Sequence, residues 1–93
     1  MRNKKTKYKM KNKIEIAPLA DYYVIAAKDK KTGELVDAFT LNESGTDMLK
    51  LLCQGKDTNS VAKEISEMYE VPFEQVFDDI TSFVEKLNRK DLI

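Results

Sequence analysis

The sequence has no histidine, no tryptophan, one cysteine, two prolines and three glycines among its 93 residues. Without histidine, the commonest general base and metal ligand at neutral pH is missing. The single thiol, Cys53, has no partner for an intramolecular disulfide or a cysteine-based zinc site. It follows Leu51 and Leu52, and we expect it to be buried and unreactive. The scattered glycines form no phosphate-binding loop. We therefore expect no catalysis, no metal and no cofactor.

Long hydrophobic runs are also absent. No apolar stretch approaches the roughly 20 residues that span a bilayer, and the N-terminus lacks the apolar core of a signal peptide. Hydrophobic residues make up 42% of the chain and charged residues 34%, which is ordinary for one globular domain. With a single cysteine, this composition predicts a cytoplasmic protein without a membrane partner.

The balanced total of 16 basic and 16 acidic residues conceals an uneven distribution. Residues 1–13 contain seven lysines and arginines and no acid, so the rest of the chain is strongly acidic. We interpret residues 1–13 as a basic flexible arm and residues 14–93 as the folded domain. The arm could contact an acidic partner such as nucleic acid, but a solubilising tail is the simpler interpretation.

Three short stretches have the composition of β-strands. Residues 14–18 alternate, residues 22–27 read Tyr-Tyr-Val-Ile-Ala-Ala, and residues 35–41 place alternate side chains on opposite faces. The link between the first two is short enough for a hairpin, and a polar turn ending at Gly33 precedes the third. These stretches predict an antiparallel meander with one face free for helices.

Three helical patterns follow. Asn42 is placed to cap a helix over residues 43–54, with Gly55 as its stop. Thr58 is the expected cap of a second helix ending near residue 70. The strongest pattern covers residues 73–88, where seven apolar side chains form one stripe and Pro72 marks the start. The final residues, 91–93, are expected to fold back onto the core.

The order of three strands and three helices predicts an α+β domain: a three-stranded antiparallel sheet followed by three helices, similar to a winged helix-turn-helix.

The spacing of several motifs resembles the PqqD-like family of peptide-binding proteins, also called RiPP recognition elements. The stretch 41–45 reads Leu-Asn-Glu-Ser-Gly, and Gly55 is followed three residues later by Thr58. A Tyr-Glu-Val triplet ends at Val71, and residues 79, 83 and 87 are Asp, Phe and Leu. The resemblance covers residues 14–93. It departs from the family at residues 48–49, where Met-Leu replaces a frequent tryptophan, and at residues 20–21, where Ala-Asp replaces a link that often contains glycine.

The resemblance implies a non-catalytic adaptor. Family members bind the leader segment of a ribosomally made precursor peptide and present it to a modifying enzyme, often a radical S-adenosylmethionine protein. The leader lies as an added strand beside the third strand, in the groove along the last helix.

On this chain the resemblance places the peptide-binding site on two segments. The expected site residues are Leu35, Val36, Asp37, Ala38, Phe39 and Thr40 on the third strand, with Val76, Asp79, Phe83 and Lys86 on the last helix. Backbone groups of an edge strand can bind an extended peptide. Taken alone, Phe83 suits a core position better and Asp79 a solvated one. The opposite flank of the helix, with Phe77 and Thr81, remains an alternative.

A winged-helix nucleic-acid-binding protein is the second hypothesis. It would need basic side chains on its recognition helix. The second and third helices instead carry mostly acids, among them Glu64, Glu67, Glu74 and Asp78, which a polyanion repels. Binding to nucleic acid is therefore disfavoured.

Overall fold

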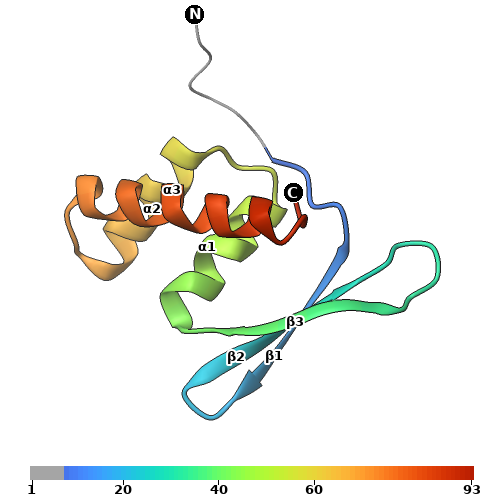
Figure 1. The fold of residues 1–93 in the computed structure, drawn as a ribbon. Helices are drawn as coiled ribbons and strands as arrows, with labels where there is room; N and C mark the ends of the chain where they lie inside the picture. Colours follow the sequence, from blue (N-terminus) through green and yellow to red (C-terminus); the bar gives the residue numbers. More distant parts are fainter. Residues whose placement is uncertain (1–7) are drawn as a thin grey trace, which may run out of the picture.

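A computed structural model describes residues 8–93 of the chain. Three strands precede three helices: β1 (Lys13–Leu19), β2 (Tyr22–Lys28), β3 (Leu35–Leu41), α1 (Glu43–Cys53), α2 (Thr58–Tyr69) and α3 (Phe73–Arg89). The strands form one antiparallel sheet in the order β1-β2-β3. Figure 1 shows the helices grouped on one side of this sheet. The expected α+β meander followed by three helices is confirmed.

The sheet has one buried and one open face. Ile25 in the central strand pairs with Ile16 of β1 and Phe39 of β3, so these side chains share a face. Ile25 and Ala27 are fully buried beneath the helices. The alternate residues, such as Ala17 and Ala38, point to the other face and are exposed. The helices therefore cover the face of the sheet that carries Ile16, Ile25 and Phe39.

The core joins the sheet to the three helices. Its largest fully buried side chains come from every helix and from the C-terminal tail, and include Leu49, Leu52, Ile65, Ile80, Leu87 and Leu92. Burying one such side chain contributes about 1.5–3 kcal/mol. Of the seven residues in the stripe predicted on α3, Val76, Ile80, Phe83 and Leu87 are buried in this core. Phe77 and Val84 are partly buried, and Phe73 at the start of the helix is 42% exposed.

Helix ends follow the sequence with one correction. Asn42 caps α1 by accepting a hydrogen bond from the Gly45 amide at 2.8 Å, as predicted. Gly55 has a φ of 89°, a left-handed conformation that suits glycine after a helix. The expected cap of α2 was wrong: Asp57, rather than Thr58, accepts from the Ser60 amide at 2.8 Å. The Asp57 carboxylate is the better cap because its negative charge is also stabilised by the positive, N-terminal end of the helix dipole.

Part of the predicted basic arm lies against the domain. Tyr8 and Met10 pack on the core, and the Lys11 amide donates to the Leu92 carbonyl at 2.8 Å. Residues 8–12 therefore line up beside the C-terminal tail, which folds back as predicted. The rest of the predicted arm, residues 1–7, lies outside the described residues.

The prediction of a buried cysteine was wrong. Cys53 is exposed at the end of α1, and it lines a surface hollow with Tyr8 and Met10. Partial burial raises the pKa of the Cys53 thiol above its ordinary value, because it disfavours the charged thiolate. The thiol is therefore protonated at neutral pH, which lowers its reactivity despite its exposure.

Candidate functional site: an open strand edge beside the last helix

The site begins with the direction of the backbone groups on β3. The Ala38 amide donates to Asp37 Oδ1 at 2.8 Å, so it points away from β2. In an antiparallel pair the N–H and C=O of one residue point to the same side, and this side alternates along the strand. Ala38 and Thr40 therefore turn their backbone groups outward, whereas Asp37 and Phe39 bond to β2. The outward groups form an open edge.

The other edge of the sheet, on β1, is obstructed. Ile25 uses its backbone groups toward Phe39, so its β1 partner Ile16 has its own groups turned outward. Two residues further along, Pro18 also faces outward, and it has no N–H to donate. A proline on an edge strand hinders the addition of another strand. The edge of β3 is thus the one that keeps its donors.

A hollow lies where β3 ends and α1 begins. Its volume is about 290 Å³, and one wall is the flank of α3 that carries Asp79, Ser82, Phe83 and Lys86. The opposite wall and floor are Leu41, Asn42, Ser44, Gly45 and Met48. Phe83 is only 9% exposed, so it belongs to the core and to the rim of the hollow at once. The hollow can accept an apolar side chain from a chain lying along β3.

Gly45 keeps this hollow open at the start of α1. A Cβ added at this position would lie 3.1 Å from Asn42 Oδ1, the oxygen that caps the helix, and 3.5 Å from the side chain of Leu41. Any larger residue would therefore press against the capping oxygen of Asn42 and would also project into the hollow. This contact accounts for a glycine inside the helix, where it costs about 1 kcal/mol relative to alanine.

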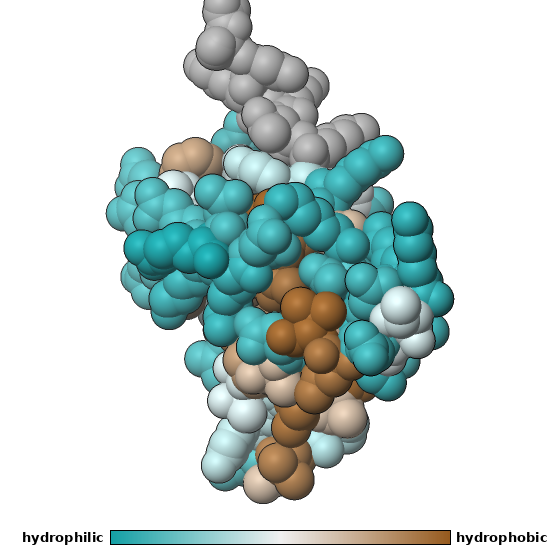
Figure 2. Space-filling model, turned by 45° about the vertical axis from the view of Figure 1, so that its right-hand side comes forward, coloured by the Kyte–Doolittle hydropathy of each residue, from teal (hydrophilic) through white to brown (hydrophobic). Residues whose placement is uncertain are grey.

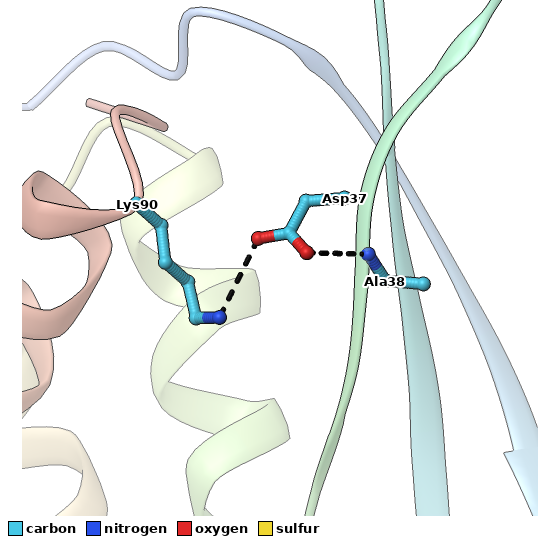
Figure 3. Close-up of polar contacts among 3 residues, drawn as sticks. All are labelled: Asp37, Ala38 and Lys90. Carbon is cyan, nitrogen blue, oxygen red and sulfur yellow. Dashed lines mark hydrogen bonds and ion pairs between the residues drawn. The ribbon is translucent and has the colours of Figure 1, made fainter.

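Lys90 connects the C-terminal end of α3 to β3. Its ammonium lies 3.4 Å from Asp37 Oδ2 and 4.8 Å from the centre of the Phe39 ring. Figure 3 shows the side chains of Asp37 and Lys90 meeting across the gap between strand and helix. The Asp37–Lys90 ion pair bridges β3 and α3 at this end, whereas the hollow lies at the other end.

Charge and hydrophobicity are arranged along this groove. The α3 flank carries Asp79 beside the hollow and then Lys86 and Lys90 toward the end at Asp37. Of the large hydrophobic side chains that stay exposed in residues 8–93, Leu35 and Val36 belong to β3, whereas Leu19 and Tyr22 lie at the turn between β1 and β2. In Figure 2 a band of hydrophobic residues runs through the middle and lower part of the molecule, at the height of the sheet, between hydrophilic borders.

The structure places the predicted site residues in three environments. Leu35 and Val36 are 61% and 54% exposed at the start of β3. The side chains of Asp37 and Phe39 face the helices, and those of Ala38 and Thr40 face the open side of the sheet. Asp79, Phe83 and Lys86 line the hollow, but Val76 is 2% exposed and belongs to the core. Although nearly fully buried, Val76 lines a second hollow of about 200 Å³ that shares Ser44, Met48 and Asp79 with the first.

The alternative flank of α3 lies apart from the hollow. The Phe77 ring stacks on Phe73 at 5.9 Å between centroids, and the Thr81 hydroxyl donates to the Phe77 carbonyl. Neither residue lines the hollow beside β3. The flank with Asp79 and Phe83 is the one beside the open edge.

Sequence reasoning missed several residues of the groove. They are Leu41, Asn42, Ser44, Gly45 and Met48 at the junction of β3 and α1, with Ser82 and Lys90 on α3. Helical spacing could have found the last two, because Ser82 precedes Lys86 by four positions and Lys90 follows it by four. Of the junction residues, Asn42 is explained by its role as a helix cap, and the spacing of the other four does not indicate that they line a hollow.

Within residues 8–93, no group of three or more histidine, cysteine, aspartate or glutamate side chains is arranged to hold a metal ion. Over the same residues, no helix has the length and hydrophobicity needed to cross a bilayer.

Comparison with known proteins identifies the family. The family model for coenzyme PQQ synthesis protein D (PqqD) matches residues 29–93, which include β3 and all three helices. The chain belongs to the PqqD family. No curated protein matches this PqqD-family chain.

Two solved structures resemble this PqqD-family chain over most of its length. One is described as TbiB1 in complex with the TbiA(beta) leader peptide; it is 26% identical, with a TM-score of 0.69 over 91% of this chain and 93% of that one. The other is lasso peptide synthetase B1 complexed with the leader peptide, 23% identical, with a TM-score of 0.64 over 85% of this chain and 87% of that one. At 23% identity, the second likeness concerns the fold alone.

Proposed function

We propose that this PqqD-family protein is a non-catalytic adaptor that captures the leader segment of a ribosomally made precursor peptide and presents it to a modifying enzyme. The observation that carries the proposal is the open edge of β3 beside the hollow on α3. The similar TbiB1 structure contains a bound leader peptide, which supports a peptide-binding role for this fold.

The leader binds by strand addition. The outward N–H and C=O groups of Ala38 and Thr40 pair with the backbone of the peptide, which provides affinity without regard to sequence. Alternate side chains of the peptide then point toward the helices, where the hollow beside Phe83 accepts an apolar one. Selectivity comes from this hollow and from the charges of Asp79 and Lys86 on its wall.

The binding site in this proposal keeps both segments expected from the sequence. Leu35, Val36, Asp37, Ala38, Phe39 and Thr40 form the strand wall, and Val76, Asp79, Phe83 and Lys86 form or support the helix wall. Residues 14–93 are the recognition domain, with residues 8–13 packed on it.

The modifying enzyme supplies the chemistry. A radical S-adenosylmethionine protein is the enzyme class that the family resemblance favours, and the adaptor itself needs no cofactor. Binding between such partners takes place in the cytoplasm, where precursor peptides are made.

A nucleic-acid-binding function has less support. The exposed acids of α2 and α3 include Glu67, Glu74, Asp78 and Glu85, and they would repel a phosphate backbone. The basic arm, residues 1–13, could bind nucleic acid weakly and without sequence preference. Such binding would fall steeply with salt and would be lost on deletion of residues 1–13.

Titration of the ¹⁵N-labelled 93-residue protein with precursor peptides encoded near its gene tests the proposal. We expect one such peptide to bind and to shift the amide resonances of β3 and of the Asp79–Lys86 flank of α3. If no neighbouring peptide shifts these resonances, the proposed function is wrong.

A further inference from the structure

The Asp37 carboxylate makes two contacts at the place where a peptide strand would lie. Its Oδ1 accepts from the Ala38 amide at 2.8 Å, and its Oδ2 lies 3.4 Å from Lys90 Nζ. Figure 3 shows both contacts on one carboxylate, between β3 and the end of α3. The Asp37 side chain thus accepts from the Ala38 amide of the open edge and also pairs with the Lys90 ammonium of the opposite wall.

The position of Asp37 in the sheet explains this geometry. Its backbone pairs with Ala27, which is fully buried, so its side chain starts on the face that carries the helices. The carboxylate turns back from there to the edge and reaches the outward amide of its neighbour. A strand added to β3 needs the same Ala38 N–H for its own carbonyl oxygen. The carboxylate and the peptide therefore compete for one donor.

We infer that Asp37 is a built-in competitor for the open edge, and that this edge selects peptides carrying a carboxylate that takes its place beside Lys90. This inference rests on the proposed function and adds a requirement for the chemistry of the peptide. It concerns a peptide with an acidic side chain, aspartate or glutamate, near the end of the groove opposite the hollow.

The carboxylate of the peptide is needed because of what Lys90 faces. When Asp37 leaves, the ammonium remains 4.8 Å from the centre of the Phe39 ring, with a second cation, Lys86, one helical turn away on α3. A neutral strand covering this end would desolvate Lys90 without pairing it, which is unfavourable. An acidic side chain restores the ion pair in a more enclosed setting.

Displacement of Asp37 is feasible. The side chains of Lys90 and Asp37 are 38% and 32% exposed, and exposed ion pairs of this kind are weak and screened by salt. Asp37 can turn its carboxylate to water without movement of the strand. Competition by Asp37 therefore weakens the binding of peptides that lack an acidic side chain more than it weakens the binding of peptides that have one.

Selection from a displayed library of random twelve-residue peptides tests this inference on the full 93-residue protein. The variants are Asp37→Ala, which removes the competitor, and Lys90→Met, which keeps an unbranched side chain of similar length but removes the charge. Lys56→Met is the matched control, because Lys56 and Glu64 form an ion pair at 2.9 Å with similar exposure, 39% and 40%. Amide spectra of every variant confirm that it is folded and show whether selected peptides bind at β3.

We expect peptides selected on the wild type to be enriched in aspartate or glutamate at a fixed distance from an apolar residue. This enrichment should disappear with Lys90→Met and persist with Lys56→Met. Asp37→Ala should bind glutamine-for-glutamate versions of the selected peptides roughly three- to tenfold more tightly than the wild type does, because the edge donor is then free.

Two results overturn the inference and separate it from the proposed function. If selected peptides shift β3 but show no acidic preference, or keep it with Lys90→Met, the inference is wrong and strand addition stands. If no selected peptide shifts β3 in any variant, the inference and the proposed use of the edge both fail.

Discussion

The Lys11 amide donates to the Leu92 carbonyl at 2.8 Å, and the Lys11 ammonium lies 2.6 Å from an oxygen of Asp91. These contacts join the segment before β1 to the tail after α3. The Leu92 side chain is fully buried, and its amide donates to the Leu87 carbonyl of α3. The tail therefore fixes the last turn of α3, including Lys90, opposite β3.

Truncation of Leu92 should destabilise the domain. Leu92→Ala removes a fully buried side chain, and we expect the free energy of unfolding to fall by about 2–5 kcal/mol. Lys11→Ala breaks an exposed ion pair and should cost less than about 1 kcal/mol. Urea denaturation followed by circular dichroism measures both. Similar costs for the two variants would show that the tail is held by its surface contacts rather than by burial.

The direction of the Ala38 amide makes a proline substitution informative. Ala38→Pro removes a donor that faces the open edge and leaves the hydrogen bonds between β2 and β3 in place. We expect the affinity for a leader peptide to fall roughly tenfold or more, because the peptide loses a backbone partner. Isothermal titration calorimetry measures this loss.

Ala38→Val is the control at the same position, because it keeps the N–H and adds only a β-branched side chain on the exposed face. It should bind within roughly twofold of the wild type, a change well below the effect of one lost hydrogen bond. Equal losses for valine and proline would mean that the side chain, and not the edge donor, matters.

The flank of α3 that contacts the peptide can be tested with two neighbouring substitutions. Ser82→Phe fills the hollow of about 290 Å³ and should reduce leader affinity roughly tenfold or more, since it excludes an apolar side chain of the peptide. Thr81→Phe places the same ring on the other flank and should leave affinity nearly unchanged. Fluorescence anisotropy of a labelled leader compares them, and the reverse order would assign binding to the flank with Phe77.

The turn before β3 predicts a dependence on pH. Asp29 Oδ1 accepts from the amides of Thr32 and Lys31, and these hydrogen bonds hold the pKa of its carboxyl below its ordinary value of 3.8. The folded state therefore binds this proton less readily than the unfolded state does. The stabilisation is fully present above pH 3.8 and is lost as the pH falls through the lower, folded-state pKa.

Comparison of the wild type with Asp29→Ala tests this dependence. The variant should have a lower urea midpoint at neutral pH, and the difference should shrink at a pH well below 3.8. Asp29→Asn keeps an acceptor oxygen and should lie between the two at neutral pH. A difference that is independent of pH would mean that the ionised carboxylate does not stabilise the turn.

Much of the fold follows from local patterns in the sequence. The seven apolar side chains of α3 and the alternation of residues 35–41 each predict an element within one residue of its observed ends. Helix starts were less certain because several residues could act as the cap, as at Asp57 and Thr58. Both can accept from the backbone, and the charged carboxylate of Asp57 is additionally favoured by the helix dipole.

The site was harder to predict than the fold. Periodicity identified Phe83 and Asp79, but it cannot show which backbone groups of an edge strand face outward. That depends on the pairing register of β2 and β3, which sets the direction of the Ala38 amide. The contact between Asp37 and Lys90 joins residues 53 positions apart, and only the packing of α3 beside β3 brings them together.

Amide hydrogen exchange of the protein with and without its leader peptide tests the central claim most directly. Strand addition to β3 predicts that the outward amides of Ala38 and Thr40 become protected when the peptide binds, while the outward amide of Ile16 on β1 does not change. Protection at β1 or on the exposed face of α2, with β3 unchanged, would contradict the account.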